Sequence, residues 1–156
     1  MICCRFVLFG STIKCINKNN NIHGELMLYK LSYANVKILA NNLAEVIVDN
    51  DVMVTLEMVE EFDLFIQENF QQPFAVLVNK INRYEYSFEA MASMVSHELI
   101  IAVAVINYDD VDEDPIHQVL KIRTIDQLNI KVFSGLELGW QEAKKWLVEE
   151  LASVKA

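Results

Sequence analysis

The chain of 156 residues has little cysteine, and all of it lies at one end. Cys3, Cys4 and Cys15 are the only cysteines, so residues 16–156 contain none. The body of the chain therefore has no disulfide framework, no cysteine nucleophile and no thiolate zinc site, a pattern that predicts a cytoplasmic protein. A chain of this length buries enough surface for an ordinary core, so folding requires no metal or disulfide.

Glycine and long apolar runs are also scarce. Gly135 and Gly139 are the only glycines beyond residue 26, and they follow the last predicted strand, so no glycine-rich phosphate loop is present. The longest uninterrupted apolar run, residues 99–106, falls far short of the roughly 20 residues that a membrane-spanning helix requires. We therefore expect no membrane insertion and no cofactor.

Basic side chains are few outside the first stretch. Residues 27–156 carry 10 basic and 21 acidic side chains, whereas residues 1–26 carry three basic and one acidic. An acidic surface repels phosphate backbones and anionic lipid headgroups, which excludes nucleic acid and bare membrane as favoured partners. The same charge suits a basic protein partner.

Residues 1–26 differ from the rest in pattern as well as in charge. Residues 14–21 are polar and rich in asparagine, with no apolar period, and Met27 begins the first well-patterned segment. We interpret residues 1–26 as a disordered extension, or as sequence upstream of a true translation start at Met27. Residues 27–156 are then the folded domain.

The first half of this domain predicts an antiparallel hairpin followed by a helix and a strand. Extended segments are expected over 29–33, 36–40 and 44–48, and Asn41-Asn42 suits the positive φ angles of a tight turn. Thr55 is a candidate N-cap, and residues 74–78 form an apolar run typical of a buried parallel strand. Helical spacing gives the inward face of the intervening helix as Leu56, Val59, Phe62, Ile66 and Phe70.

The second half continues the alternation of helices and strands. Ser87 predicts the cap of a second helix, Asp114-Pro115 the start of a third, and Gly135 and Gly139 bracket the turn into a fourth. Buried strands are expected over 99–106 and 130–133. The inward residues of the second helix are predicted as Phe88, Met91, Ala92 and Val95, and those of the last helix as Trp140, Ala143, Leu147, Leu151 and Val154. The pattern predicts an α/β domain with a mixed sheet of about five strands and about four helices.

Over residues 27–152, the order of elements and several local patterns resemble the STAS superfamily, specifically the SpoIIAA-like bacterial proteins. The matching features are Val46-Ile47-Val48 in the hairpin, Val54-Thr55-Leu56-Glu57 before the first helix, residues 74–78, Val132-Phe133, and residues 142–147. The resemblance implies a mixed sheet with four helices and membership of a group that includes anti-sigma-factor antagonists and transporter regulatory domains. It implies no catalysis.

In the antagonists of that superfamily, a serine at the start of the second helix is phosphorylated, and Ser87 occupies the corresponding place. The sequence there reads Tyr86-Ser87-Phe88-Glu89 instead of Asp-Ser-Ser-Gly. Glu85 and Glu89 would repel an added phosphate, so we interpret Ser87 as a plain N-cap.

The preferred binding site is the segment that joins the strand at 74–78 to the second helix, because ligands bind at the carboxyl ends of strands in α/β sheets. Its candidate ligand- or partner-binding residues are Lys80, Arg83, Tyr84, Tyr86 and Ser87. The two basic groups could hold an anion, and the two tyrosines could line the site. The alternative is an ordinary polar loop whose basic groups pair with nearby carboxylates.

Other polar clusters favour structural roles. Residues 109–114 hold five carboxylates, which could bind a divalent cation, but they lack the glycine and glutamate of an EF-hand, so a solvated loop is favoured. His97 and His117 are interpreted as structural.

These observations predict a non-catalytic STAS-like module that regulates or scaffolds a partner protein through the Lys80–Ser87 loop and the second helix. The alternative is a carrier or sensor of a small apolar or acidic ligand, since the SpoIIAA-like fold resembles CRAL-TRIO lipid-binding domains. An enzyme is disfavoured because no catalytic constellation is visible. A partner module should expose an apolar patch, whereas a carrier should contain a cavity.

Overall fold

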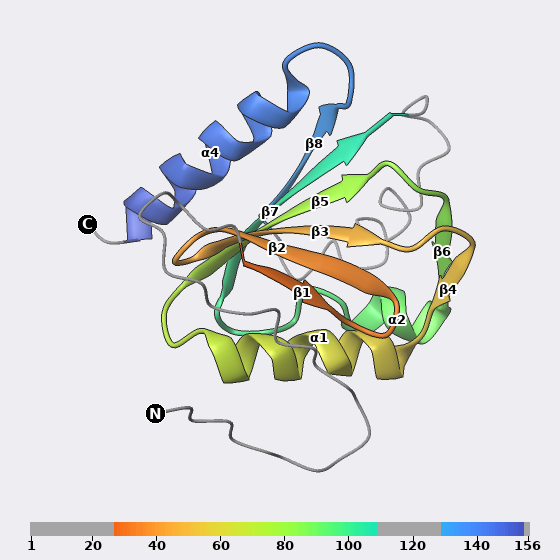
Figure 1. The fold of residues 1–156 in the computed structure, drawn as a ribbon. Helices are drawn as coiled ribbons and strands as arrows, with labels where there is room; N and C mark the ends of the chain where they lie inside the picture. Colours follow the sequence, from red (N-terminus) through yellow and green to blue (C-terminus); the bar gives the residue numbers. More distant parts are fainter. Residues whose placement is uncertain (1–26, 109–128, 155–156) are drawn as a thin grey trace, which may run out of the picture.

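The computed structural model describes residues 27–108 and 129–154, which form an α/β fold with a mixed sheet (Figure 1). The sheet has six strands in the order β1-β2-β3-β5-β7-β8. These strands are β1 (Leu28–Lys30), β2 (Ala34–Ala40), β3 (Leu43–Val48), β5 (Phe74–Lys80), β7 (Ile100–Asn107) and β8 (Ile130–Ser134). The helices are α1 (Leu56–Asn69), α2 (Phe88–Ser93) and α4 (Gly139–Val154). The predicted α/β class is confirmed.

Two strands outside this sheet were not predicted. β4 (Val52–Val54) and β6 (Tyr84–Tyr86) pair with each other in parallel as a separate sheet. Each has three residues, too few for a period of two to be recognised. The main sheet thus has six strands where about five were predicted, and the described residues form three helices where about four were predicted. Residues 1–26, the acidic run 109–114, His117 and the helix predicted from Asp114 lie outside the described residues.

The sheet has an antiparallel part, in which consecutive strands are joined by short turns, and a parallel part, in which longer connections cross from one strand to the next. β1, β2 and β3 pair antiparallel, while β3, β5, β7 and β8 pair in parallel. The turn lies at Asn41-Asn42 as predicted, but neither residue has a positive φ angle. A register shift between Ile38 and Ala40 precedes the turn instead, and such bulges adjust the twist of a hairpin.

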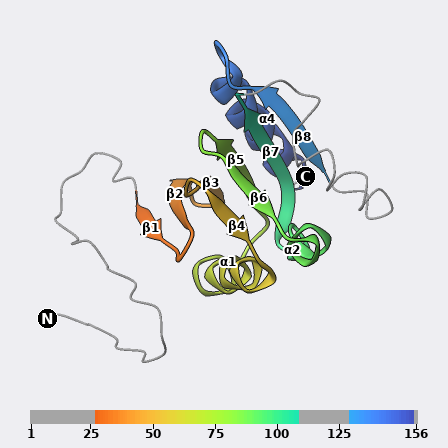
Figure 2. The ribbon, with the colours of Figure 1, turned by 90° about the vertical axis from the view of Figure 1, so that its right-hand side faces the viewer.

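Helices cover the sheet on two sides. Figures 1 and 2 show α1 and α2 together on one side and α4 against the other. Alternate residues along each strand face opposite sides. The α4 side receives Leu43, Ala75, Leu77, Ala102, Ala104 and Ile106, and the α1 side receives Val36, Val46, Val48, Val76, Val103 and Val105. The cluster on the α1 side also contains Ala34, Ala44 and Phe74, so its strand residues are mostly but not all valines.

The core-facing sides of two helices differ from the prediction. In α1, Val59, Ile66 and, just beyond the helix end, Phe70 are buried as predicted, whereas Leu56 and Phe62 are half-buried and Phe65 is buried although it was not predicted. In α2 the prediction is correct in part. Met91 and Val95 pack against the core, but Phe88 is 65% exposed, Ala92 is exposed, and the buried residue is Ala90.

Helix α4 follows the predicted stripe except at its end. Ala143, Leu147 and Leu151 are buried, and Trp140 is half-buried, whereas Val154 at the C-terminus of the helix is exposed. The helix begins at Gly139, where a Cβ atom would lie 1.5 Å from the carbonyl oxygen of Ser134. This glycine therefore permits the close approach of α4 to the end of β8.

Candidate functional site

A pocket of about 80 Å³ lies between the valine-rich side of the sheet and the helices α1 and α2. Its walls are almost entirely apolar, and its polar lining groups are Tyr33, Asp63, Lys80 and Tyr86. The apolar lining residues are Val46, Val48, Val54, Val59, Phe62, Val76, Val78, Met94, Val95, Ile100, Val103 and Val105. The residues come from the hairpin, from α1, from both small strands and from the centre of the sheet, so the pocket forms only in the folded chain.

The sequence explains why this space is not filled. Protein interiors are normally packed without voids larger than a water molecule. Here six valines from β3, β5 and β7 face the pocket. On the opposite side, Val59 and Phe62 of α1 and Met94 and Val95, which follow α2, line the pocket. The short valine side chains of the sheet therefore leave a volume that leucine side chains would partly occupy.

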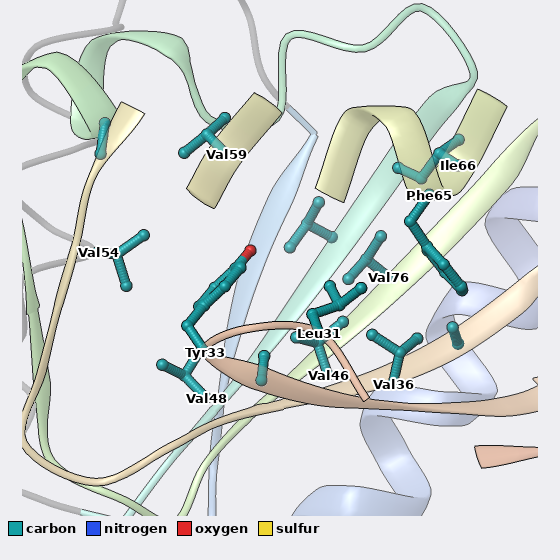
Figure 3. Close-up of a cluster of buried hydrophobic side chains, with 14 of the residues drawn as sticks. Leu31, Tyr33, Val36, Val46, Val48, Val54, Val59, Phe65, Ile66 and Val76 are labelled. Carbon is teal, nitrogen blue, oxygen red and sulfur yellow. The ribbon is translucent and has the colours of Figure 1, made fainter. Parts of the chain in front are cut away.

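Tyr33 brings a hydroxyl group into this apolar space. The residue lies in the β1–β2 connection, and its side chain extends between Val48 and Val54 towards Val59 on α1 (Figure 3). It is 6% exposed, and no hydrogen bond to its hydroxyl occurs in the structure of residues 27–108 and 129–154. Burial raises the pKa of Tyr33, and Tyr86, Glu61 and Asp63 raise it further. The hydroxyl is therefore protonated and able to donate.

The ring of Tyr33 is held in place through its neighbour in the chain. The backbone N–H of Ser32 donates to Glu61 Oε1 over 2.9 Å, and the Ser32 hydroxyl donates to Glu61 Oε2. Glu61 is on α1, so both oxygens of one carboxylate tie the β1–β2 connection to the helix that covers the pocket. The Asp49 backbone N–H donates to the Tyr33 carbonyl over 2.8 Å, which fixes the other side.

Asp63 is the acidic group of the pocket. It lies one turn after Val59 on α1 and is half-buried. Burial raises the pKa of Asp63, Glu60 raises it further, and His97 acts in the opposite direction. In the described part of the chain, no hydrogen bond or ion pair engages its carboxylate. An apolar pocket thus contains two polar groups, Tyr33 and Asp63, whose hydrogen-bonding capacity is available to a ligand.

Val95 contributes an unusual backbone to the pocket wall. Its φ angle is 61°, in the left-handed region that β-branched residues rarely adopt. Such a conformation costs of the order of 1–3 kcal/mol and persists where the surrounding structure enforces it. Val95 follows the end of α2 and lines the pocket beside Met94. The strain is therefore located in the segment that closes the pocket between α2 and β7.

Of the five residues predicted as a site, the structure brings two into the pocket. Lys80 and Tyr86 line it. Tyr84 is buried behind them: its ring centroid lies 5.4 Å from that of Tyr86, and the Lys80 ammonium lies 5.4 Å from its centre. Arg83 is exposed outside the pocket and contributes backbone contacts with Asn50 and Asp51. Ser87 caps α2 by accepting a hydrogen bond of 3.1 Å from Ala90 N–H, as the N-cap interpretation predicts.

Sequence reasoning missed Tyr33 and Asp63. Both carry a signal that is visible afterwards: Asp63 is four residues from Val59 and three from Ile66, which is an inward position of the helix. Tyr33 ends a segment in which every second residue is large and apolar or aromatic: Tyr29, Leu31 and Tyr33. Neither signal identifies a shared site, because the two residues meet only when α1 folds over the hairpin.

A second polar cluster lies on the α4 side of the sheet. Glu45, which is 5% exposed, accepts hydrogen bonds through Oε1 from Asn79 Nδ2 (2.8 Å) and from Trp140 Nε1 (3.0 Å). The cluster ties β3, β5 and α4 together. We assign it to structure, because both donors are directed at the same carboxylate oxygen.

The described residues contain no cluster of side chains arranged to hold a metal ion and no helix able to cross a membrane. No three or more histidine, cysteine, aspartate or glutamate side chains in residues 27–108 and 129–154 are arranged to hold a metal ion. Helices α1, α2 and α4, the ones that the structure describes, lack the length and apolar character needed to cross a membrane.

The structure describes an α/β domain with an apolar pocket on one side of its sheet. Comparison of the chain with protein-family models, with curated proteins and with solved structures found no match. The resemblance to the STAS superfamily thus stays a prediction from the sequence.

Proposed function

We propose that the domain is a non-catalytic carrier or sensor that binds a small, largely apolar molecule in the pocket. The observation that carries the proposal is the pocket of about 80 Å³ between the valines of the sheet and α1, which is lined by Tyr33, whose hydroxyl makes no hydrogen bond to the described residues. Apolar walls with a few polar groups are typical of small-molecule sites.

The energetic argument supports a ligand. An unfilled apolar volume of about 80 Å³ costs at most about 2 kcal/mol at the value measured for enclosed engineered cavities. A ligand that fills the pocket and pairs with the Tyr33 hydroxyl supplies packing contacts and a hydrogen bond that the described residues do not supply.

The volume limits the size of the ligand. An engineered cavity of about 150 Å³ holds benzene. The present pocket is about 80 Å³, so it has room for a short branched alkyl group. A larger apolar ligand requires displacement of Met94 and Val95, which follow α2 and are partly exposed.

Filling the pocket tests the proposal. Val76→Leu adds a methylene group at the centre of the valine wall, and Val148→Leu adds the same group at a 50% exposed position on α4. We expect isobutanol to shift the valine methyl NMR signals of the pocket in the wild-type protein and in Val148→Leu, and to bind Val76→Leu several-fold more weakly. Isobutanol that shifts no pocket methyl group, or equal affinity for both variants, contradicts the proposal.

A second candidate function, regulation of a partner protein, has an observation in its favour. Ile81 in the β5–β6 loop is 62% exposed and Phe88 on α2 is 65% exposed. Both lie on the face predicted to meet a partner. If this face binds a partner, Phe88→Ser abolishes recovery of a stoichiometric protein with the native domain, whereas Leu136→Ser, an equally exposed position beyond β8, retains it.

A further inference from the structure

The polar residues that line the pocket include one acid, Asp63, and one base, Lys80. Tyr33, Tyr86 and Asp63 line the pocket, and Glu61 lies close enough for its charge to oppose ionisation of Tyr33. Glu61 is occupied by Ser32. Asp63 therefore brings a negative charge to the pocket that no residue of the described structure neutralises by an ion pair.

A positive group, Lys80, also lines the pocket. Its ammonium is positioned over the ring of Tyr84, 5.4 Å from the ring centre, and the Tyr84 hydroxyl accepts a hydrogen bond of 3.4 Å from the Tyr86 hydroxyl. Lys80 ends β5, whereas Asp63 lies within α1, and Asp63 makes no ion pair with a described residue. His97 lowers the pKa of Asp63 and Glu60 raises it. The α1 side of the pocket thus carries the acidic group, with Tyr33 close to it.

We infer that the ligand is a short-chain aliphatic amine, whose alkyl group packs on the valines and whose ammonium group binds between the Asp63 carboxylate and the hydroxyls of Tyr33 and Tyr86. This inference rests on the proposed function and specifies its ligand class. A carboxylate suits a cation, and aromatic rings attract cations through their faces. A carboxylic acid would place its negative charge beside Asp63.

The half-buried position of Asp63 also limits the desolvation cost of binding a charged ligand. An ammonium group loses much of its hydration in an apolar space, and the loss is tolerable only where a partner charge and some solvent remain. Asp63 is half-buried, so the head of the ligand keeps partial contact with water while the alkyl group packs on the apolar walls of the pocket.

Three probes with one carbon skeleton test the inference. Isobutylamine, isobutanol and isobutyrate carry a cationic, a neutral and an anionic head at neutral pH. Titration of each into the full chain, followed by the valine methyl NMR signals, gives three dissociation constants. We expect isobutylamine to bind about tenfold more tightly than isobutanol, as a charge-assisted hydrogen bond provides, and isobutyrate to bind most weakly.

Variants assign the preference to its residues. Asp63→Asn keeps the shape of the side chain and removes its charge, so the affinity for isobutylamine should fall about tenfold, to that for isobutanol. Glu57→Gln removes an exposed acid on the same helix and should leave both affinities unchanged. Tyr33→Phe removes the buried hydroxyl and should weaken both amine and alcohol.

The outcomes separate the two proposals. If isobutanol or isobutyrate binds the wild-type protein as tightly as isobutylamine, the amine inference is wrong while the pocket remains a binding site. If none of the three probes shifts a pocket methyl signal, the proposed function fails as well. The ranking of the probes is measured on the wild-type chain and does not depend on any variant being folded.

Discussion

At the scale of the residue, Asp63 occupies a position that is unfavourable for an ionised carboxylate. A carboxylate on the core-facing side of a helix normally acquires a partner, because burial disfavours its charged form. Asp63 has no ion-pair partner in the described structure, and burial raises its pKa. The residue therefore reduces the stability of the ligand-free protein at neutral pH.

The sign of this effect gives a testable pH dependence. The pKa of Asp63 is higher in the folded than in the unfolded chain, so its contribution to stability is complete at low pH and is lost as the pH rises through the folded-state pKa. We expect Asp63→Asn to have a higher Tm than wild type at pH 7, with the difference shrinking below about pH 4. Thermal unfolding followed by circular dichroism across this range measures it.

Glu57→Gln provides a control of opposite sign. The Thr55 side chain and the backbone N–H of Glu57 itself lower the pKa of Glu57 through hydrogen bonds. Removal of this charge should leave Tm unchanged or lower it at pH 7. A Tm for Asp63→Asn at or below that of wild type at pH 7 would show that the carboxylate is compensated in solution.

At the scale of the element, length decides whether the sequence is sufficient to predict a helix or strand. The strands β2, β3, β5, β7 and β8 and the helices α1 and α4 are long enough for their apolar spacing to predict them. The predicted inner side of α2 is correct only in part, at Met91 and Val95, because a six-residue helix has fewer than two turns of pattern. β4 and β6 depend on the pairing of Val54 with Tyr86, which local sequence does not reveal.

The residues of the pocket also divide into those that the sequence predicts and those that it does not. The rule that ligands bind after the carboxyl ends of strands predicts Lys80 and Tyr86, which line the pocket. It does not predict Tyr33 or Asp63, since the first belongs to the hairpin and the second to the middle of α1. Their proximity results from the packing of α1 on the sheet and from the bond between Ser32 and Glu61.

The Ser87 N-cap should contribute measurably to the stability of α2, because this helix has only six residues. Ser87→Ala removes the hydrogen bond from Ala90 N–H and should cost about 1 kcal/mol of unfolding free energy. Hydrogen exchange should accelerate most at Ala90 and in the following residues that lead to the pocket. Thr55→Ala is the comparison: Thr55 precedes α1 without a side-chain bond to the helix backbone and bonds only the exposed Glu57 side chain, so its loss should be smaller. Equal losses in the two variants would contradict the role of the Ser87 cap.

At the scale of the whole molecule, one contact joins the two ends of the described fold. Trp140 on α4 donates to Glu45 on β3, 95 residues earlier in the chain, and Asn79 on β5 shares the same acceptor oxygen. The contact connects the hairpin that begins the sheet with the helix that covers its other side. Its loss leaves a buried carboxylate with one donor fewer.

Trp140→Phe tests this connection. We expect a loss of roughly 1–3 kcal/mol in unfolding free energy, measured by urea denaturation, because Glu45 stays buried with its Asn79 bond alone. Trp146→Phe is the control: its ring contacts Phe133 with centroids 5.9 Å apart, and its indole makes no hydrogen bond within the described residues. Trp146→Phe that destabilises the protein as much as Trp140→Phe would show that lost packing, and not the bond to Glu45, causes the effect.

The valine wall has a consequence for how this domain can change over generations. Codons for valine become codons for alanine, leucine or isoleucine through one base substitution. Each such change at Val46, Val76, Val103 or Val105 alters the pocket by one or two carbon atoms and leaves the strand backbone as it is. Descendants of one gene can therefore differ in pocket volume through single steps, and if the pocket binds a ligand as proposed, these positions are the ones at which its size preference can be changed.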